Sequence, residues 1–313
     1  MKYLPFLAGG YSVSPGLTPM QKARDPLDQL VFQVDDLYET YIQNKIACRQ
    51  ENIHKYYCQV KLFPETALAV NQYLAEGLVR EHPGIFSLQT LEDGYLLTNK
   101  NTGEKIAWGR DWLNVRGDFY QSLFDALCSQ AQEDFAICQL EEQKDWMAAI
   151  HLCAPNHWAA TDKTGKPFDI VHAPVPGMEK TMKHYFKMLS HITQKGPFTR
   201  FAWGIASDKR LNHHPEPPPG ADPDEWYGRK ANQENLELHI RVERQNLIGL
   251  PKVNAFLFTI RTYFYPVESC TNEEKQALLE AIKNMSPEAL RYKGLSGKEA
   301  FFRKKLKDSF PDS

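Results

Sequence analysis

The sequence predicts an α+β protein built on an antiparallel sheet, and three patterns lead to this prediction. Apolar residues recur at helical spacing in the first quarter of the chain. Short apolar or alternating runs follow from Trp146 to Pro266, and helical spacing returns after Thr271. Because helices and strands are grouped rather than strictly alternating, an antiparallel sheet is favoured over repeated βαβ units.

The first quarter predicts two amphipathic helices. Apolar residues lie three and four positions apart over residues 26–49 and again over 65–80, where His82-Pro83-Gly84 ends the pattern. The stretch GYLLTNKNTGEKIAWG then places two apolar runs around Asn99–Gly103, which predicts a β-hairpin. A further helix is expected around FYQSLFDALCSQ.

The later half predicts the main strands. WMAAIHLC and RFAWGIA are short and apolar, and MEKTMKHYFKMLSHI between them has helical spacing. LELHIRVE and AFLFTIRTYFYP alternate apolar and polar residues, and the short connection NLIGLPKVN predicts that they pair antiparallel. Two helices are expected in TNEEKQALLEAIKNM and SGKEAFFRKKLKDSF. The Pro-rich HHPEPPPGADPDEWYG predicts a long surface loop in which His213 and His214 are exposed.

Composition indicates a folded, water-soluble protein with small-molecule or protein partners. The 313 residues are 42% hydrophobic and 24% charged, and 37 basic residues against 39 acidic ones leave a net charge of −2. This balance provides no electrostatic case for nucleic acid or an anionic membrane, and no apolar run is long enough to span one. The six cysteines form no CxxC pair, which favours reduced thiols and a cytoplasmic location.

Several familiar catalytic motifs are absent from the sequence. It contains no GxGxxG, GxxxxGK[ST], HExxH or GxSxG. Dinucleotide binding, P-loop phosphoryl transfer, zincin hydrolysis and α/β-hydrolase chemistry therefore lose support.

One histidine, His172, lies in a stiff stretch, DIVHAPVPG. Pro174 and Pro176 fix φ at two positions and are expected to hold Ala173 and Val175 extended, so that ordering the imidazole costs little entropy. Such a histidine suits a metal or a cofactor iron. The alternative is a structural histidine that packs in a turn and donates to a carbonyl.

Two further groups of residues carry candidate chemistry. RVERQ brings Arg241, Glu243 and Arg244 to a predicted strand, where they bind an anionic ligand or form internal ion pairs such as Glu243 with Arg261. Alternation places Arg241 and Glu243 on one face and Arg244 on the other. CAPNHW places Trp158 in a loop, either over a ligand or in the core.

Taken together, these segments resemble one known family. GLTPM, FQVDDLYETYIQNK, CAPNHW, GKPFDIVHAPVPG, FAWGIA, LHIRVERQNLIGLP and AFLFTIRTYFYP occur in this order over most of the chain. The series resembles the alpha subunit of haem-dependent oxidative N-demethylase. VHAPVP and the RVERQ-to-FTIRTY block are the most specific parts of the resemblance.

The resemblance implies a PAS-like haem protein that acts as an oxygenase. One domain over residues 1–313 is expected, with a helical region at 1–83, a PAS-like haem-binding core at 84–268 and terminal helices at 269–313. Haem b and O2 would oxidise a methyl group of a small secondary amine such as dimethylamine, and the carbinolamine would release formaldehyde. Separate partner subunits with FMN and a [2Fe-2S] cluster would supply electrons from NADPH.

Carried onto this sequence, the resemblance also implies roles for individual residues. His172 becomes the expected iron ligand. Arg241 and Arg244 become candidates for pairing with haem propionates, and Glu243 for holding the substrate ammonium or relaying protons. Trp158 and Trp203 are expected to wall the haem. This sequence differs from the family pattern at His157, which adds a second possible ligand or a distal donor; His151 is a third candidate ligand.

Two other hypotheses remain open at this stage. A PAS-like haem or small-molecule sensor would bind its ligand without turnover, although no kinase, cyclase or DNA-binding module is recognisable in the chain. A purely structural interpretation makes His172 and the arginines core polar groups and predicts a colourless protein.

Overall fold

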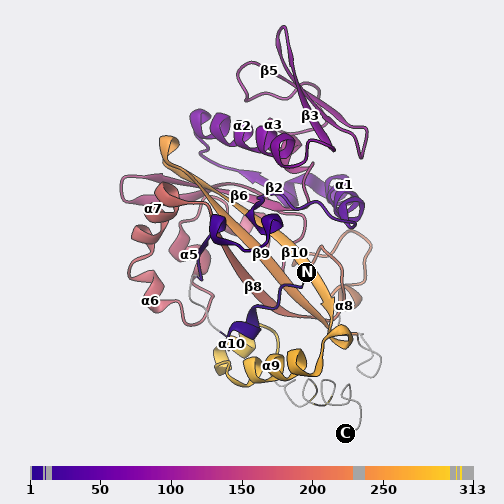
Figure 1. The fold of residues 1–313 in the computed structure, drawn as a ribbon, viewed down its shortest axis with the longest axis vertical. Coiled ribbons are helices and arrows are strands. Elements are labelled where there is room, and N and C mark those ends of the chain that lie inside the picture. Colours follow the sequence, from indigo (N-terminus) through magenta and orange to yellow (C-terminus); the bar gives the residue numbers. More distant parts are fainter. Residues whose placement is uncertain are drawn as a thin grey trace.

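A seven-stranded antiparallel sheet forms the centre of the described part of the chain (Figure 1). The computed structural model describes residues 2–9, 11, 16–227, 237–296, 301 and 304. In spatial order the strands are β1 (Thr18–Pro19), β8 (Phe198–Ala206), β9 (His239–Leu250), β10 (Ala255–Pro266), β6 (Asp134–Glu141), β7 (Lys144–His151) and β2 (Tyr57–Gln59). Every neighbouring pair in this order is antiparallel, which confirms the predicted α+β class.

The long hairpin of β9 and β10 is the central pair of this sheet. The predicted antiparallel pairing is confirmed, but its connection is shorter than expected. Asn246–Leu250 continue β9, and the turn consists of η5 (Pro251–Val253) and Asn254, whose φ of 48° is left-handed. The alternation of β9 holds: Ile240 and Val242 pack on one face, whereas Arg241 and Glu243 lie on the other.

Helices of the middle segment cover the sheet face on which Leu247 and Phe258 lie. These are α4 (Ala160–Lys163), α5 (Phe168–His172), α6 (Glu179–Met182) and α7 (Tyr185–Lys195). Leu189 and Ile192 of α7 pack with Leu247, and Phe258 lies against the same cluster. In Figure 1, α5, α6 and α7 lie side by side along one flank of the sheet.

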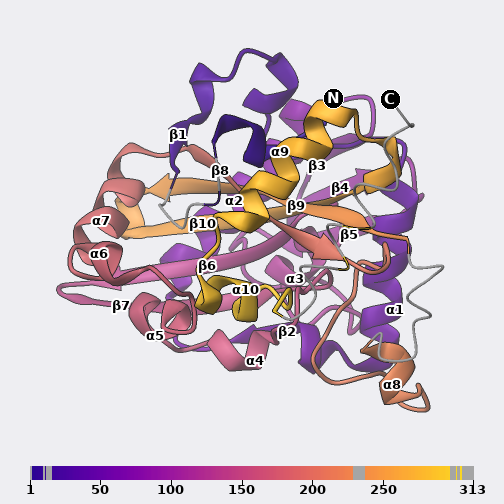
Figure 2. The ribbon, with the colours of Figure 1, turned by 90° about the horizontal axis from the view of Figure 1, so that it is seen from below.

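The first C-terminal helix packs on the opposite face. Leu278 and Ile282 of α9 (Asn272–Lys283) form a cluster with Trp203 and Phe6, the latter in η1 (Pro5–Ala8). As predicted, Thr271 caps α9 through the Glu274 amide. Two short elements flank α9: η6 (Val267–Ser269) precedes it and α10 (Pro287–Tyr292) follows it. The sequence pattern predicted neither of them. Figure 2 shows α9 lying across the strands.

The N-terminal region adds helices and a second sheet. It contains η2 (Met20–Lys22), η3 (Pro26–Gln29), α1 (Tyr38–Tyr56), α2 (Pro64–Glu81), β3 (Phe86–Leu91), β4 (Gly94–Asn99), β5 (Lys105–Gly109) and α3 (Leu123–Cys128). The predicted hairpin is β4 with β5, and β3 completes the three-stranded sheet. The predicted second helix agrees with α2.

The first predicted helix begins later than expected, at Tyr38 instead of near Pro26. The carboxylate of Asp25 caps a short 3₁₀ turn, and the chain then runs extended. The amides of Val31 and Phe32 both donate to Glu81, 2.9 Å away in each case. These tertiary bonds take the place of helical ones.

Two more differences concern the middle and the end of the chain. Strand β6 lies before Trp146, where strands were first expected, and seven of its eight residues are buried. The helix predicted over residues 296–310 lies almost entirely outside the described residues. Of the helices that the structure describes, none is long and apolar enough to cross a membrane.

Candidate functional site

His172 is the last residue of α5, a single turn that begins after Pro167. The expected extended backbone is wrong at Ala173, which is helical (φ −51°, ψ −35°). The Val175 amide donates to the His172 carbonyl at 2.9 Å, and this turn offsets the preference of a residue before proline for an extended conformation. The imidazole is therefore fixed by a helix end and a turn.

The two nitrogens of the His172 ring differ in their environment. Nδ1 lies 2.9 Å from the Phe168 carbonyl, one helical turn earlier, and so carries the proton. Nε2 has no partner among the described residues. The ring stacks on Phe168 at 3.9 Å, and Phe168 stacks on Tyr185. Burial lowers the pKa of His172 to about 4, so the ring is neutral at pH 7.

Glu243 lies on the same face of the sheet as α4 to α7. Arg241 Nη2 lies 3.6 Å from its carboxylate, and Gln245 donates to it at 2.9 Å. The alternative ion pair with Arg261 does not form, because Arg261 binds Asp35 at 2.8 Å. Arg241 also donates to the Ala154 carbonyl at 2.7 Å, so it holds Glu243 in place from a buried position.

Two cations that the sequence did not single out, Lys163 and Arg200, lie near His172. Burial is the largest cause of the lowered pKa of the His172 imidazole, and the positive charges of Lys163 and Arg200 lower it further. Burial lowers the pKa of Lys163 to about 8 and also lowers that of Arg200, and Glu243 opposes both shifts. Neither side chain forms a hydrogen bond or ion pair within the described residues, and Arg200 Nε is buried without a partner. Such unpaired cations fit an anionic ligand.

The tryptophans and Arg244 are divided between the two faces of the sheet. Trp158 lies under Lys163, whose Nζ is 3.7 Å from the ring centroid, and packs near Phe258. Trp203 instead contacts Phe6 on the α9 face. Arg244 is fully buried on that face and donates to the carbonyls of Asp28 and Leu30. The structure therefore brings His172, Glu243 and Trp158 to one side, and leaves Trp203 and Arg244 on the other.

The other histidines of interest lie apart from His172. His157 has a left-handed backbone (φ 61°) and a ring 5.4 Å from that of His213. His151 is buried against Asp125 and Tyr57. His213 and His214, expected to be exposed, are only 7% and 4% exposed. The reason is a set of bonds to the core: His213 binds Asp208 at 3.0 Å and contacts Arg241 at 3.3 Å.

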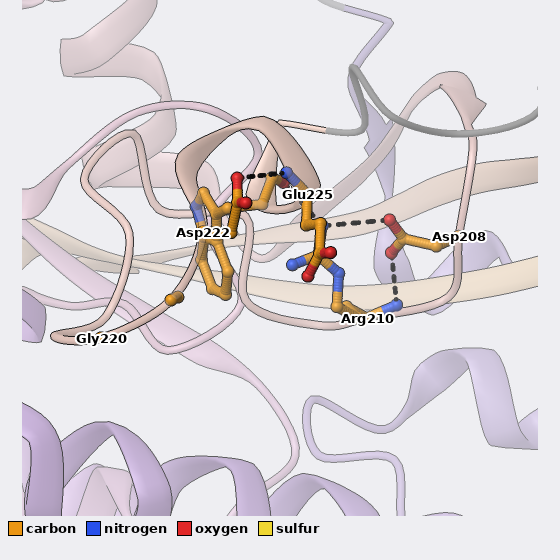
Figure 3. A pocket seen from close by; sticks show the side chains of 7 residues that line it. Asp208, Arg210, Gly220, Asp222 and Glu225 are labelled. Carbon is orange, nitrogen blue, oxygen red and sulfur yellow. Dashed lines mark hydrogen bonds and ion pairs between the residues drawn. The ribbon is translucent and has the colours of Figure 1, made fainter.

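The Pro-rich loop also forms a surface pocket of about 480 Å³ (Figure 3). Asp208, Arg210 and Trp226, the last residue of α8 (Pro223–Trp226), line it. Asp208 is paired with Arg210 at 3.1 Å, and the Arg210 guanidinium lies over the Trp226 ring. The Asp208 and Arg210 charges are therefore paired with one another at the wall of this pocket.

A comparison with known families finds a match. Residues 23–300, most of the chain, match the family described as haem-dependent oxidative N-demethylase, alpha subunit-like. The matched range includes both the His172 turn and the β9–β10 hairpin.

Proposed function

The chain belongs to the haem-dependent oxidative N-demethylase, alpha subunit-like family, and from this premise we propose that it is a catalytic subunit that oxidises a methyl group of a small secondary amine such as dimethylamine. Formaldehyde and the smaller amine are the products. In this proposal residues 1–313 form one domain, and the core at 84–268 is PAS-like.

The observation that carries the proposal is the state of His172. Its Nδ1 is committed to the Phe168 carbonyl, which leaves a neutral Nε2 free as a ligand. A hydrogen bond of this kind orients a ligating histidine and raises its basicity. The unpaired Lys163 and Arg200 beside it suit the two propionates of haem b. The residues present therefore fit the cofactor, with His172 as the iron ligand.

Trp158 is the aromatic residue that we assign to the haem edge. Its ring faces Lys163 on the same side of the sheet as His172, and a flat apolar cofactor suits an aromatic surface. Arg241 takes a positioning role in place of the expected propionate contact, because its guanidinium is already bound to Ala154 and Glu243. Trp203 and Arg244 have no role in the proposed site.

Glu243 is proposed to bind the substrate ammonium and to accept its N–H proton. A secondary amine is protonated near neutral pH, and a carboxylate that is partly shielded from water attracts its ammonium group. Arg241 and Gln245 keep the Glu243 carboxylate oriented while one oxygen accepts the N–H proton. Bound haem supplies the activation of O2, and the protein supplies the ligand, the walls and the charge balance.

Electrons are proposed to come from separate partner subunits that carry FMN and a [2Fe-2S] cluster and use NADPH. A cytoplasmic location is part of the same proposal, since all six cysteines are free. The alternative function, a haem or small-molecule sensor, uses the same His172 ligand but requires no electron supply.

The direct test is an absorption spectrum of the protein loaded with haem, recorded before and after reduction and with dimethylamine added. We expect a Soret band that dimethylamine shifts in the wild type. In His172→Ala the band should be lost or moved, because the iron loses its protein ligand. The matched control is His184→Ala, an exposed histidine on the neighbouring segment, which should leave the spectrum unchanged.

Each outcome has a distinct meaning. A wild-type protein that binds no haem rejects both the oxygenase and the haem-sensor hypotheses. Haem binding that survives unchanged in His172→Ala would move the ligand to another residue, with His157 the first to test. A Soret band that responds to the amine supports a haem site that binds the substrate; absence of product when an electron donor is also supplied would then favour the sensor.

A further inference from the structure

A second cluster of chemically active side chains lies at the end of β6 and β7, apart from His172. Ligand atoms of Asp134, His151 and Cys153 all lie within 4.8 Å of one another. The three residues are 2%, 1% and 1% exposed. They come from the first residue of β6, the last residue of β7 and the second position beyond it, so two paired strands fix their spacing.

His151 has the strongest unexplained feature in this cluster. Within the part of the chain that the structure describes, neither of its ring nitrogens makes a hydrogen bond, although the residue is only 1% exposed. Nε2 lies 3.2 Å from the carboxylate of Asp125, but not in the alignment of a hydrogen bond. Asp125 is in turn held by Arg49. A carboxylate behind one imidazole nitrogen is the usual support for a histidine whose other nitrogen binds a metal.

The remaining groups supply ligands and balance the charge. Cys48 lies beside the cluster, and its thiol donates to the Cys153 carbonyl at 3.7 Å. Lys45 is buried beside the cluster and donates to the carbonyls of Cys128 and Glu133, the latter next to Asp134 in the chain. A divalent ion held by two thiolates, one carboxylate and a neutral imidazole carries a net charge of −1. The Lys45 ammonium offsets that charge without exposing it to water.

We propose that Asp134, His151 and Cys153 bind a structural zinc ion, with Cys48 as the fourth ligand. Thiolate and imidazole donors favour Zn²⁺ over hard ions such as Mg²⁺ or Ca²⁺. A tetrahedral zinc site separates its ligand atoms by about 3.5 Å, so closure requires Asp134, His151 and Cys153 to draw together by only about an ångström. The ion joins α1 to the ends of β6 and β7, and the site is independent of haem.

The test is the zinc content of the purified full chain, both free of haem and loaded with it, together with a Co²⁺ titration. We expect one equivalent of zinc that is additional to haem iron. Co²⁺ should give a thiolate charge-transfer band in the near ultraviolet and intense visible bands of a tetrahedral ion. Cys153→Ser should lose about half of the charge-transfer intensity, because Cys48 remains as a thiolate ligand, and at least tenfold in Co²⁺ affinity.

Control variants separate binding from folding. Cys138→Ser, also buried but outside the cluster, should keep the zinc and the Co²⁺ bands. If Cys153→Ser does not fold, His151→Gln replaces it, because the amide keeps the size of the ring without its nitrogen pair. The proposal is overturned if the wild type takes up neither ion after metal loading, or if the Co²⁺ spectrum shows no thiolate band. Neither result bears on haem binding, so the proposed function stands or falls separately.

Discussion

The orientation and the pKa of the His172 imidazole depend on atoms outside the VHAPVP motif. The prolines suggested a stiff segment, but the ring is fixed by the Phe168 carbonyl and by stacking on Phe168. Its burial lowers the pKa to about 4, which no motif encodes. The resemblance implies that this residue is the iron ligand, and the structure adds the neutral, oriented imidazole on which the proposal rests.

The lowered pKa of His172 predicts a stability that depends on pH. An unfolded histidine takes up its proton near pH 6.5, whereas the folded one does so only near pH 4. Between these values the unfolded chain binds more protons, so the free energy of unfolding falls as pH falls and levels off below about pH 4. From pH 7 to pH 5 we expect His172 to account for a loss of about 1 to 2 kcal/mol.

Urea unfolding of the haem-free protein at pH 7 and pH 5 measures this loss. In His172→Gln the difference between the two pH values should be smaller by that amount. His184→Gln is the control, since an exposed histidine should leave the wild-type difference intact. Equal pH dependence in wild type and His172→Gln would show that the imidazole is not held neutral by the fold.

At the scale of elements, regular patterns were predictable and fully buried or tertiary-bonded segments were not. The alternation in LELHIRVE locates β9 because one face is apolar and the other polar. Strand β6 carries no such signal, since it is buried on both faces. The helix expected from Pro26 failed because Glu81, some fifty residues away, accepts the amides of Val31 and Phe32. Helical spacing alone cannot reveal that partner.

The same limit explains the residues missed at the site. Lys163 ends α4 and Arg200 lies in β8, and only the packing of α4 to α7 on the sheet brings them to His172. Neither belongs to a motif. Glu243 could be predicted because alternation places it with Arg241, but its contact with Gln245 instead of Arg261 depends on the geometry of β9.

The positions of Lys163 and Arg200 beside His172 predict how firmly the protein holds haem. Removing the charge in Lys163→Met or Arg200→Met should accelerate haem loss roughly tenfold each, because one charge-assisted contact to a propionate disappears. Transfer of haem to an excess of apomyoglobin measures the rate. Lys187→Met, an exposed lysine of α7, is the matched control and should keep the wild-type rate. Unchanged rates in both variants would place the propionates elsewhere.

At the scale of the whole molecule, the main sheet separates the candidate site on one face from a packed apolar core on the other. The α4–α7 face holds His172 and Glu243, and the α9 face is a packed core that contains Trp203 and Arg244. The Pro-rich loop is tied to the first face through Asp208, His213 and Arg241. The α4–α7 face therefore holds the candidate site, and in the proposed function its electrons come from partner subunits.

This arrangement predicts how turnover depends on partners. The haem-loaded chain with O2, NADPH and dimethylamine should form no formaldehyde, because nothing in the proposal lets this subunit accept hydride from NADPH. Adding a ferredoxin and its NADPH-dependent reductase should start formaldehyde production. Glu243→Gln, which keeps the shape of the side chain but not its charge, should slow that reaction by at least tenfold and weaken the spectral response to the amine. A wild-type protein that binds the amine, accepts electrons into its haem and still yields no formaldehyde would favour the sensor over the oxygenase.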